Sequence, residues 1–343
     1  MRIREFVSLK KMTTLKIGGV ARYFCAVERA EELSEALAFA REKRINLVVF
    51  GGGSNVLIAD EDIDALIIKI DIKGIGWKED SEDVLVVAGA GESWDGLVAK
   101  AVRRELWGVE NLSGIPGTVG AAPIQNIGAY GTEIKETLAW VEVFDTRSGK
   151  FRTLSNKECK FGYRDSIFKR PKGKSLIITR VALWLKKSGT PNLEYKDLKE
   201  RFRIYDLRFK KKRLTPLDIR KTVLEIRSRK FPDLRTHGTA GSFFKNPIIS
   251  QGKFNKLKKK FPDLPGFPIF TRFKIPLAWI LDNVCGLKGF CKGNVTLFER
   301  QPIVIVQNGK ASAEEIKSFA KEISDKVKAK TDIDIEWEIQ QIW

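Results

Sequence analysis

Histidine is almost absent from this sequence: His237 is the only one among 343 residues. The four cysteines, Cys25, Cys159, Cys285 and Cys291, are scattered and form no C-x-x-C pair. Because zinc sites are built mostly from several cysteine and histidine ligands, we expect no metal site. Isolated thiols of this kind are typical of a reducing compartment, in which they stay buried or idle.

Long apolar runs are also missing, and none could cross a bilayer. The first residues, MRIREFVSLKK, are basic, but no apolar stretch follows them, so we expect no signal peptide. These features favour a cytoplasmic protein without a membrane partner. The apolar content of 43% and the length are sufficient for two or three domains with sizeable cores.

Acidic residues are outnumbered by basic ones. The sequence has 43 Asp and Glu but 62 Lys and Arg, which gives a formal net charge of +19. Such a surface attracts nucleic acid, acidic lipid or a phosphorylated small substrate. Local basic runs lie at 208–213 and 253–260, and the second keeps Phe254 and Leu257 at helical spacing. We favour solvated surface for both runs. Nucleic-acid binding is the lesser hypothesis, because no motif of stacking aromatics accompanies the charge.

Helical and strand patterns follow one another without regular βαβ repetition, which predicts an α+β fold. Capping residues mark several helix starts, including Ser93, Ser155 with Glu158, Thr215 before Pro216, and Ser312. The patterns predict helices at 29–44, 93–106, 155–162, 215–231 and from 312, a hairpin over 139–154, a buried strand at 46–50, and further strands at 65–70, 84–91, 175–185, 302–306 and 332–339.

Glycine is concentrated in three segments of the first 131 residues: GGGSN (51–55), IPGTVGAA (115–122) and QNIGAYG (125–131). Glycines let the backbone approach a ligand closely and turn N–H groups towards phosphate oxygens. Three such segments around a long irregular stretch favour a large phosphate-bearing cofactor. None matches G-x-G-x-x-G after a first strand or a P-loop, so the usual dinucleotide fold and the P-loop are disfavoured.

The segment HGTAGSFFKNP (237–247) contains a glycine-flanked serine, Ser242, with His237 as a doubtful base. A serine hydroxyl can instead give its proton to a carbanion or enolate whose charge is held nearby, which points to reduction of a polarised double bond. FGYRDSIFK (161–169) places Tyr163 beside Arg164, a group able to grip a carboxylate. Glu338 falls on the polar side of the closing strand, a pattern typical of a solvated carboxylate.

Four segments resemble, in order and spacing, motifs of the UDP-N-acetylenolpyruvoylglucosamine reductase family, the bacterial flavoenzymes that make UDP-N-acetylmuramate for peptidoglycan. The resemblance runs from about Thr14 to Glu338. It implies an α+β protein with an FAD-binding fold of the vanillyl-alcohol-oxidase type in two lobes and a C-terminal substrate-binding domain. The resembling segments are GGGSNVLI, GIPGTVGAAPIQNIGAYG, FGYRDSIFK and GTAGSFFKNP.

The resemblance implies non-covalent FAD, NADPH as co-substrate and UDP-N-acetylglucosamine enolpyruvate as substrate, in a cytoplasmic monomer. Ser242 matches the proton donor, Arg164 the arginine that stabilises the enolic intermediate, and Glu338 the acidic residue that assists there. Glu336 competes for that last role. The implied FAD contacts are Gly51, Gly52, Gly53, Ser54, Asn55, Pro116, Gly117, Gly120, Ala121, Gln125, Asn126, Gly128, Ala129 and Tyr130, and the implied substrate contacts are Tyr163, Tyr195, Lys230, Asn246 and Gln301.

The resemblance is to the subgroup in which a tyrosine loop covers the substrate, and Tyr195 in LEYKDL fits that place. We expect lobes at 1–72 and 73–228, an FAD-binding region of about 17–188, and a substrate domain at 229–343. The competing hypotheses are a flavin oxidase of the same fold, a basic nucleic-acid-binding protein without activity, and an inactive descendant of the reductase. Oxidases of this fold often tether flavin through histidine, and none lies in the expected FAD-binding half.

Overall fold

The computed structural model describes residues 1–209 and 214–343, without the side chains of residues 204–209. The chain forms two compact units. The first contains residues 1–7, 21–52 and 64–227, and the second contains residues 8–20, 53–63 and 228–343. Because early segments alternate between the units, neither unit is one continuous piece of chain. The three-part division at residues 72 and 228 stays a prediction.

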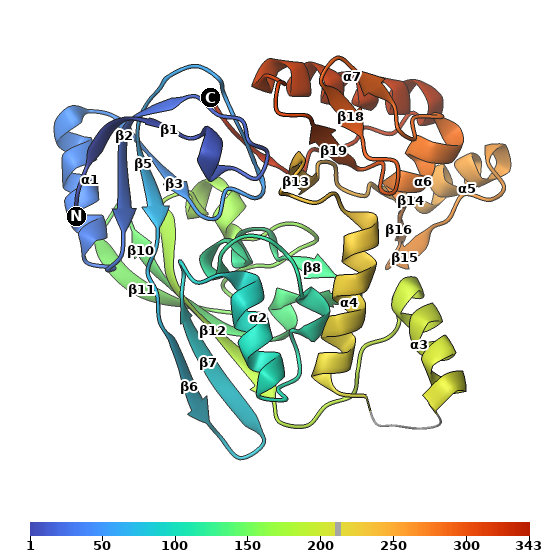
Figure 1. The fold of residues 1–343 in the computed structure, drawn as a ribbon, viewed down its shortest axis with the longest axis horizontal. Coiled ribbons are helices and arrows are strands. Elements are labelled where there is room, and N and C mark those ends of the chain that lie inside the picture. The colour runs from blue at the N-terminus through green and yellow to red at the C-terminus, as the bar shows by residue number, and fades with distance from the viewer. Residues whose placement is uncertain (210–213) are drawn as a thin grey trace. The chain divides into compact units, whose positions relative to one another are not determined.

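A five-stranded antiparallel sheet forms the centre of the first unit, in the order β11-β10-β12-β7-β6 (Figure 1). Along β7, buried and half-buried side chains alternate, as expected for a strand with one face on the core. Strand β10 buries Leu138, Val141, Val143 and Phe144 in the same core, although bulges in its pairing with β12 interrupt the alternation. The strands are β6 (Ile75–Glu79), β7 (Asp83–Gly89), β10 (Leu138–Asp145), β11 (Lys150–Ser155) and β12 (Leu176–Lys186).

A smaller sheet in the order β1-β2-β5-β3 lies beside it in sequence, and its β3 and β5 run parallel. Helix α1 buries Leu33, Ala36 and Ala40 in the common core. Helix α2 begins after Ser93, whose hydroxyl accepts a 3.2 Å hydrogen bond from the Gly96 N–H. These elements are β1 (Arg4–Ser8), β2 (Val20–Val27), α1 (Glu32–Lys43), β3 (Asn46–Phe50), β5 (Ile63–Ile70) and α2 (Trp94–Arg103).

The stretch between α2 and β10 is irregular, as its composition predicts, and consists of short turns. A separate apolar cluster joins this stretch to two helices, with Trp107 and Tyr130 packed against Leu198, Ile219 and Val223. The elements are 3-10 helices at Glu110–Leu112, Val119–Ala121, Pro123–Gln125 and Ile134–Glu136, strands β8 (Gly128–Ala129) and β9 (Thr132–Glu133), and helices α3 (Lys196–Phe209) and α4 (Pro216–Lys230).

The second unit has its own core, in which α7 packs on a four-stranded sheet ordered β13-β19-β18-β17. A three-stranded sheet, β14-β16-β15, lies beside α5. The last strand, β20, pairs in parallel with β4. The elements are β4 (Val56–Ile58), β13 (Gly238–Ser242), β14 (Ile248–Ser250), α5 (Gln251–Lys260), β15 (Phe267–Ile269), β16 (Arg272–Lys274), α6 (Leu277–Trp279), β17 (Cys291–Lys292), β18 (Val295–Leu297), β19 (Val304–Gln307), α7 (Ala313–Thr331) and β20 (Gln340–Ile342).

Most predicted elements are confirmed, but three predictions are wrong. The strand at 46–50 forms, yet it is half-exposed rather than buried. The Glu158 carboxylate accepts from the Ser155 N–H at 2.8 Å, as in the expected capping box, but residues 156–159 form only a turn. Residues 332–339 do not form a regular strand, because only Trp337 pairs as an isolated bridge, with Phe244.

The basic run at 253–260 is the surface helix α5, as predicted, with Leu257 buried. The other run, 208–213, lies outside the residues whose side chains are described. Among the described residues, no helix is both long and apolar enough to span a membrane, and no group of three His, Cys, Asp or Glu side chains could hold a metal ion.

Candidate functional site

The first two glycine segments pack directly against each other in the first unit. A Cβ on Gly52 would come within 2.8 Å of the Gly117 Cα, and one on Gly120 within 2.5 Å of the Ala90 Cβ. Side chains at these positions would therefore clash with neighbouring loops. From the sequence, we expected these glycines to let a ligand approach the backbone closely; in the structure they also let the loop backbones approach each other closely.

The third glycine segment is joined to the FGYRDSIFK segment through Asn126. This buried asparagine adopts a left-handed conformation with φ +46°. Its Nδ2 donates to the Gly162 carbonyl at 3.0 Å and to Glu133 Oε2 at 2.8 Å. The amide thus fixes the turn that carries Arg164 to the loop predicted to bind FAD.

Arg164 sits in a tight turn closed by an antiparallel bridge between Gly162 and Asp165. Its φ of +51° is rarely adopted by a residue with a long side chain. The Arg164 guanidinium donates from Nη2 to the Gly128 carbonyl at 2.7 Å and lies 5.6 Å from the Tyr163 ring centroid. The backbone therefore holds the guanidinium against the third glycine segment.

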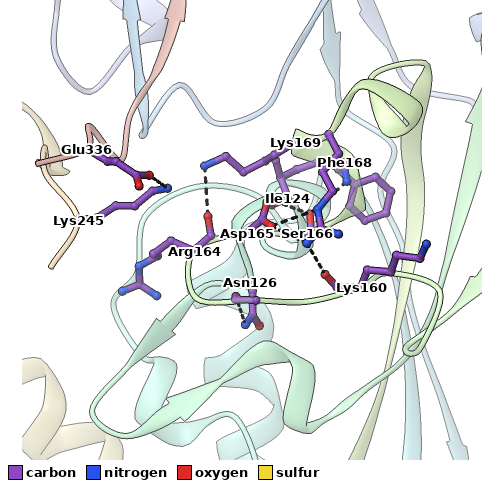
Figure 2. Close-up of polar contacts among 12 residues, drawn as sticks. Ile124, Asn126, Lys160, Arg164, Asp165, Ser166, Phe168, Lys169, Lys245 and Glu336 are labelled. Atoms are coloured by element: carbon purple, nitrogen blue, oxygen red, sulfur yellow. Dashed lines mark hydrogen bonds and ion pairs between the residues drawn. The ribbon is translucent and has the colours of Figure 1, made fainter. Parts of the chain in front are cut away.

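The hydroxyl of Ser166 is buried and has a structural function (Figure 2). It donates to the Ile124 carbonyl at 2.6 Å and accepts from the Phe168 N–H at 3.3 Å. Lys169 Nζ donates to the Arg164 carbonyl at 3.3 Å. Arg164 is thus held through both its main chain and its side chain.

In the second unit, Ser242 ends β13 just after an irregularity in the pairing with β19. Gly241 has φ +74°, and its N–H donates to the Thr239 hydroxyl at 3.2 Å. Bulges of this kind re-aim the following side chain. Ser242 is half-buried.

His237 is exposed, and its Nδ1 contacts the Thr236 hydroxyl at 2.9 Å. Five residues of extended chain span about 16 Å, so His237 is out of hydrogen-bond reach of Ser242. The structure therefore gives no Ser–His nucleophilic pair in this unit.

Glu338 lies next to the serine segment in the same unit. Its N–H donates to the Phe243 carbonyl at 2.7 Å, while the Phe243 N–H donates to the Ile303 carbonyl at 2.8 Å. Asn55 is tied to the same place, because its Nδ2 donates to the Glu338 carbonyl at 3.3 Å and its carbonyl accepts from the Gln340 N–H. The structure thus brings together Ser242, Glu338 and the end of the first glycine segment.

The two competing acidic residues differ sharply in environment. Glu338 is only 8% exposed, whereas the Glu336 side chain is 74% exposed and pairs with Lys245 at 2.7 Å (Figure 2). The expectation of a solvated Glu338 is wrong, because the chain leaves its alternating course after Trp337 and turns the carboxylate inward. A buried acidic side chain is uncommon unless it is paired or functional.

The remaining predicted residues lie in both units. Tyr195 precedes α3, is 39% exposed and packs edge-to-face on Tyr130 with ring centroids 5.1 Å apart. Asn246 Oδ1 accepts from the Leu277 N–H at 2.9 Å. The first unit contains Gly51, Gly52, Pro116, Gly117, Gly120, Ala121, Gln125, Asn126, Gly128, Ala129, Tyr130, Tyr163, Arg164 and Tyr195, and the second contains Gly53, Ser54, Asn55, Lys230, Ser242, Asn246, Gln301 and Glu338.

An electrostatic network of the first unit was missed from the sequence. Asp95 in α2 accepts two hydrogen bonds from Arg220 of α4, at 2.5 and 2.9 Å, and one from the Gly114 N–H at 2.6 Å. Burial pulls the pKa of Asp95 upward, but these hydrogen bonds outweigh it and hold the pKa below its ordinary value. The signal in the sequence was the seven-residue spacing of Arg220 and Arg227, which puts both on one face of α4.

Arg227 lies at the other end of that face. Burial lowers its pKa, which is opposed by an interaction with Tyr130. Burial also raises the pKa of Tyr130 to about 12, so its phenol stays protonated near neutrality. Asn111 supports the same loop, because its Nδ2 donates to the carbonyls of Tyr130 and Asn192 at 2.8 and 2.9 Å.

Comparison with known proteins decides between the hypotheses. The reductase of Chromobacterium violaceum is 37% identical over 98% of both chains, and that of Pseudomonas aeruginosa is 38% identical over 98% of both; each is a UDP-N-acetylenolpyruvoylglucosamine reductase. This chain belongs to that family. A family model for an FAD binding domain matches residues 21–155, and one for the C-terminal domain of UDP-N-acetylenolpyruvoylglucosamine reductase matches residues 233–342.

Solved structures agree with this assignment. The crystal structure of the UDP-N-acetylenolpyruvylglucosamine reductase from Thermus caldophilus aligns over 100% of both chains with a TM-score of 0.69 and 27% identity. The family, the oxidoreductase class, the fold and the FAD cofactor expected from the sequence are thus confirmed. The tyrosine-loop subgroup stays a prediction.

Proposed function

We propose that this member of the reductase family reduces the enolpyruvyl group of UDP-N-acetylglucosamine enolpyruvate to give UDP-N-acetylmuramate, with NADPH as the source of electrons. The observation that carries this proposal is the buried Glu338 beside the Ser242 segment, in a unit that also contains Asn55 of a glycine loop. A hydrolase has little support here, since Ser242 lacks a nearby histidine.

The glycine segments fit FAD. Where these loops pack together there is no room for side chains, so backbone groups are left to face a ligand. The FAD contacts would come from residues 51–55, 116–121 and 125–130. Bound FAD would supply the hydride, from N5 to the terminal alkene carbon. The chain's part is to bind and orient the substrate and to manage the proton and the charge.

Ser242 would supply that proton. As the hydride reaches the terminal carbon, the adjacent carbon becomes the carbanionic end of an enolate. The Oγ–H bond of Ser242 would break and a C–H bond would form at that carbon, which gives the carboxylate product and a serine alkoxide that takes a proton back from solvent. The Gly241 bulge supports this role by re-aiming the serine at the end of β13.

Arg164 and Glu338 would manage the charge of the enolate. A guanidinium can donate two hydrogen bonds to a carboxylate, and charge stabilisation of this kind is often the largest single contribution to catalysis. The strained φ of Arg164 and its contact with Gly128 support a positioned rather than a mobile guanidinium. The burial of Glu338 favours it over the exposed Glu336 for the acidic role.

The substrate contacts would be Tyr163, Tyr195, Lys230, Asn246 and Gln301, with Lys230 at the diphosphate. Tyr195 would close over the substrate as in the tyrosine-loop subgroup, and its 39% exposure beside Tyr130 leaves its ring accessible for that purpose. We also propose that the protein acts as a monomer in the cytoplasm.

The test is an anaerobic absorption experiment on the purified protein. The flavin should bleach with NADPH and regain its colour with UDP-N-acetylglucosamine enolpyruvate. Recovery of colour only with oxygen would favour an oxidase and overturn the proposed substrate. A protein that is colourless and takes up no added FAD would overturn the flavoenzyme itself.

A further inference from the structure

Residues 251–274 of the second unit form a strongly basic segment that the reductase function does not use. We call this segment, which consists of α5 and the β15–β16 hairpin, the basic hairpin. It carries seven Lys and Arg against one Asp, a formal net charge of +6, compared with +19 for the whole chain. About a third of the excess positive charge therefore lies on a small part of the protein.

The turn at the tip of this hairpin contains a residue type that is unusual for its backbone conformation. Phe270 connects Ile269 of β15 to Arg272 of β16 and has φ +51°. Two-residue hairpin turns ordinarily use glycine, asparagine or aspartate at such positions. The Phe270 side chain is 102% exposed, so it has no protein neighbours to compensate for the strain.

The hairpin has two different faces. Phe273 stacks on Phe254 of α5, with ring centroids 4.2 Å apart, so this face is covered by the helix. Because side chains alternate along a strand, Phe267 and Arg272 belong to the opposite face. Phe267 is 56% exposed. The uncovered face and the tip together present two exposed aromatic rings beside cationic groups.

We infer that the basic hairpin docks on a membrane surface that contains anionic phospholipids. Exposed aromatic side chains enter the interface between headgroups and acyl chains, and flanking lysines and arginines are attracted to anionic headgroups. A nucleic acid fits less well, because single strands bind in grooves lined with stacking platforms, whereas Phe270 projects fully into solvent. The contact is peripheral, and it adds an anionic membrane surface as a partner of a protein that we expected from its sequence to have no membrane partner.

The test is co-sedimentation of the purified protein with phosphatidylcholine vesicles, with and without roughly one-third phosphatidylglycerol. We expect binding only to the anionic vesicles. Raising NaCl from about 0.1 M to about 0.5 M should weaken binding at least tenfold, because salt screens the attraction. No binding, or equal binding to both vesicles, overturns the inference.

Two substitutions separate the aromatic and electrostatic contributions. Phe270→Gly removes the ring and relieves the positive φ, so the fold is retained, and it should weaken vesicle binding at least fivefold. Its matched control is Phe6→Gly, since Phe6 is 68% exposed and has φ +52° in the first unit. Lys256→Glu with Lys259→Glu should abolish binding, while Lys150→Glu with Lys172→Glu changes the formal charge equally and should retain most of it.

If the basic hairpin binds a partner other than a membrane, the experiments give different results. If a labelled single-stranded RNA binds more tightly than the vesicles and depends on Lys256 and Lys259, the partner is nucleic acid and the inference fails. If Phe270→Gly changes the sedimentation coefficient of the protein alone, the surface contacts a second copy of the chain and the inference also fails. Reductase activity in solution should stay unchanged in Phe270→Gly.

Discussion

The two units hold their predicted site residues by different kinds of hydrogen bond. In the first unit, side chains bind backbone carbonyls, as Asn126 does at Gly162 and Arg164 does at Gly128. In the second, the bonds that position Ser242 and Glu338 are mostly main-chain bonds, such as that between the Glu338 N–H and the Phe243 carbonyl, with one side-chain bond from Asn55 to the Glu338 carbonyl. Substitutions in the second unit should therefore change chemistry with little effect on structure, whereas those in the first should change both.

The largest expected effect is that of Ser242→Ala. Loss of the proton donor should slow flavin reoxidation by the enolpyruvyl substrate by about 10³-fold or more. Reduction of the flavin by NADPH and the free energy of unfolding should change little, because the main chain holds this position. The half-reactions are measured anaerobically by stopped-flow absorbance, and reoxidation at the wild-type rate would disprove the assignment.

Glu338→Gln should come next, with a loss of about 10²-fold in kcat, because a buried carboxylate near the reacting carbon is replaced by a neutral amide. Glu336→Gln is the matched control two residues away. Its carboxylate is exposed and pairs only at the surface, so kcat should stay within about threefold of wild type. The opposite order in steady-state assays would transfer the acidic role to Glu336.

Much of this arrangement could be predicted from the sequence, and the failures have physical causes. Caps and apolar periodicity located α1, α2, α4 and α7 because these signals act within a few residues. The burial of Glu338 could not be predicted, since alternation assumes a regular strand and the chain departs from one after Trp337. The Asp95–Arg220 pair joins residues 125 positions apart, and no local pattern carries that information.

Asp95→Asn tests the side-chain network of the first unit. We expect a loss of about 2 kcal/mol in the free energy of unfolding at pH 7, because hydrogen bonds to a charged group are removed. The pKa of Asp95 is lowered in the folded state, so its stabilisation is present above the unfolded pKa of about 3.9 and is lost as pH falls through the folded value.

Urea unfolding at several pH values measures this effect. The gap between Asp95→Asn and wild type should narrow below about pH 4. Asp64→Asn is the control, because Asp64 is 69% exposed in its pair with Arg22 and should contribute less than about 0.5 kcal/mol. A gap that stays constant down to about pH 2.5 would mean that the carboxylate charge is not what stabilises this network.

The smallest expected effect is a difference in stability between two variants of Arg164, which separates backbone strain from the loss of the guanidinium. Arg164→Ala and Arg164→Gly both remove the guanidinium, so both should lose activity to the same extent. Because residue 164 has φ +51°, the glycine variant should be more stable than the alanine variant by about 1 kcal/mol. Thermal unfolding of the two proteins measures this difference. Equal stability would mean that the turn relaxes without the arginine, and that the side chain, through its bond to the Gly128 carbonyl, holds the backbone in its left-handed conformation.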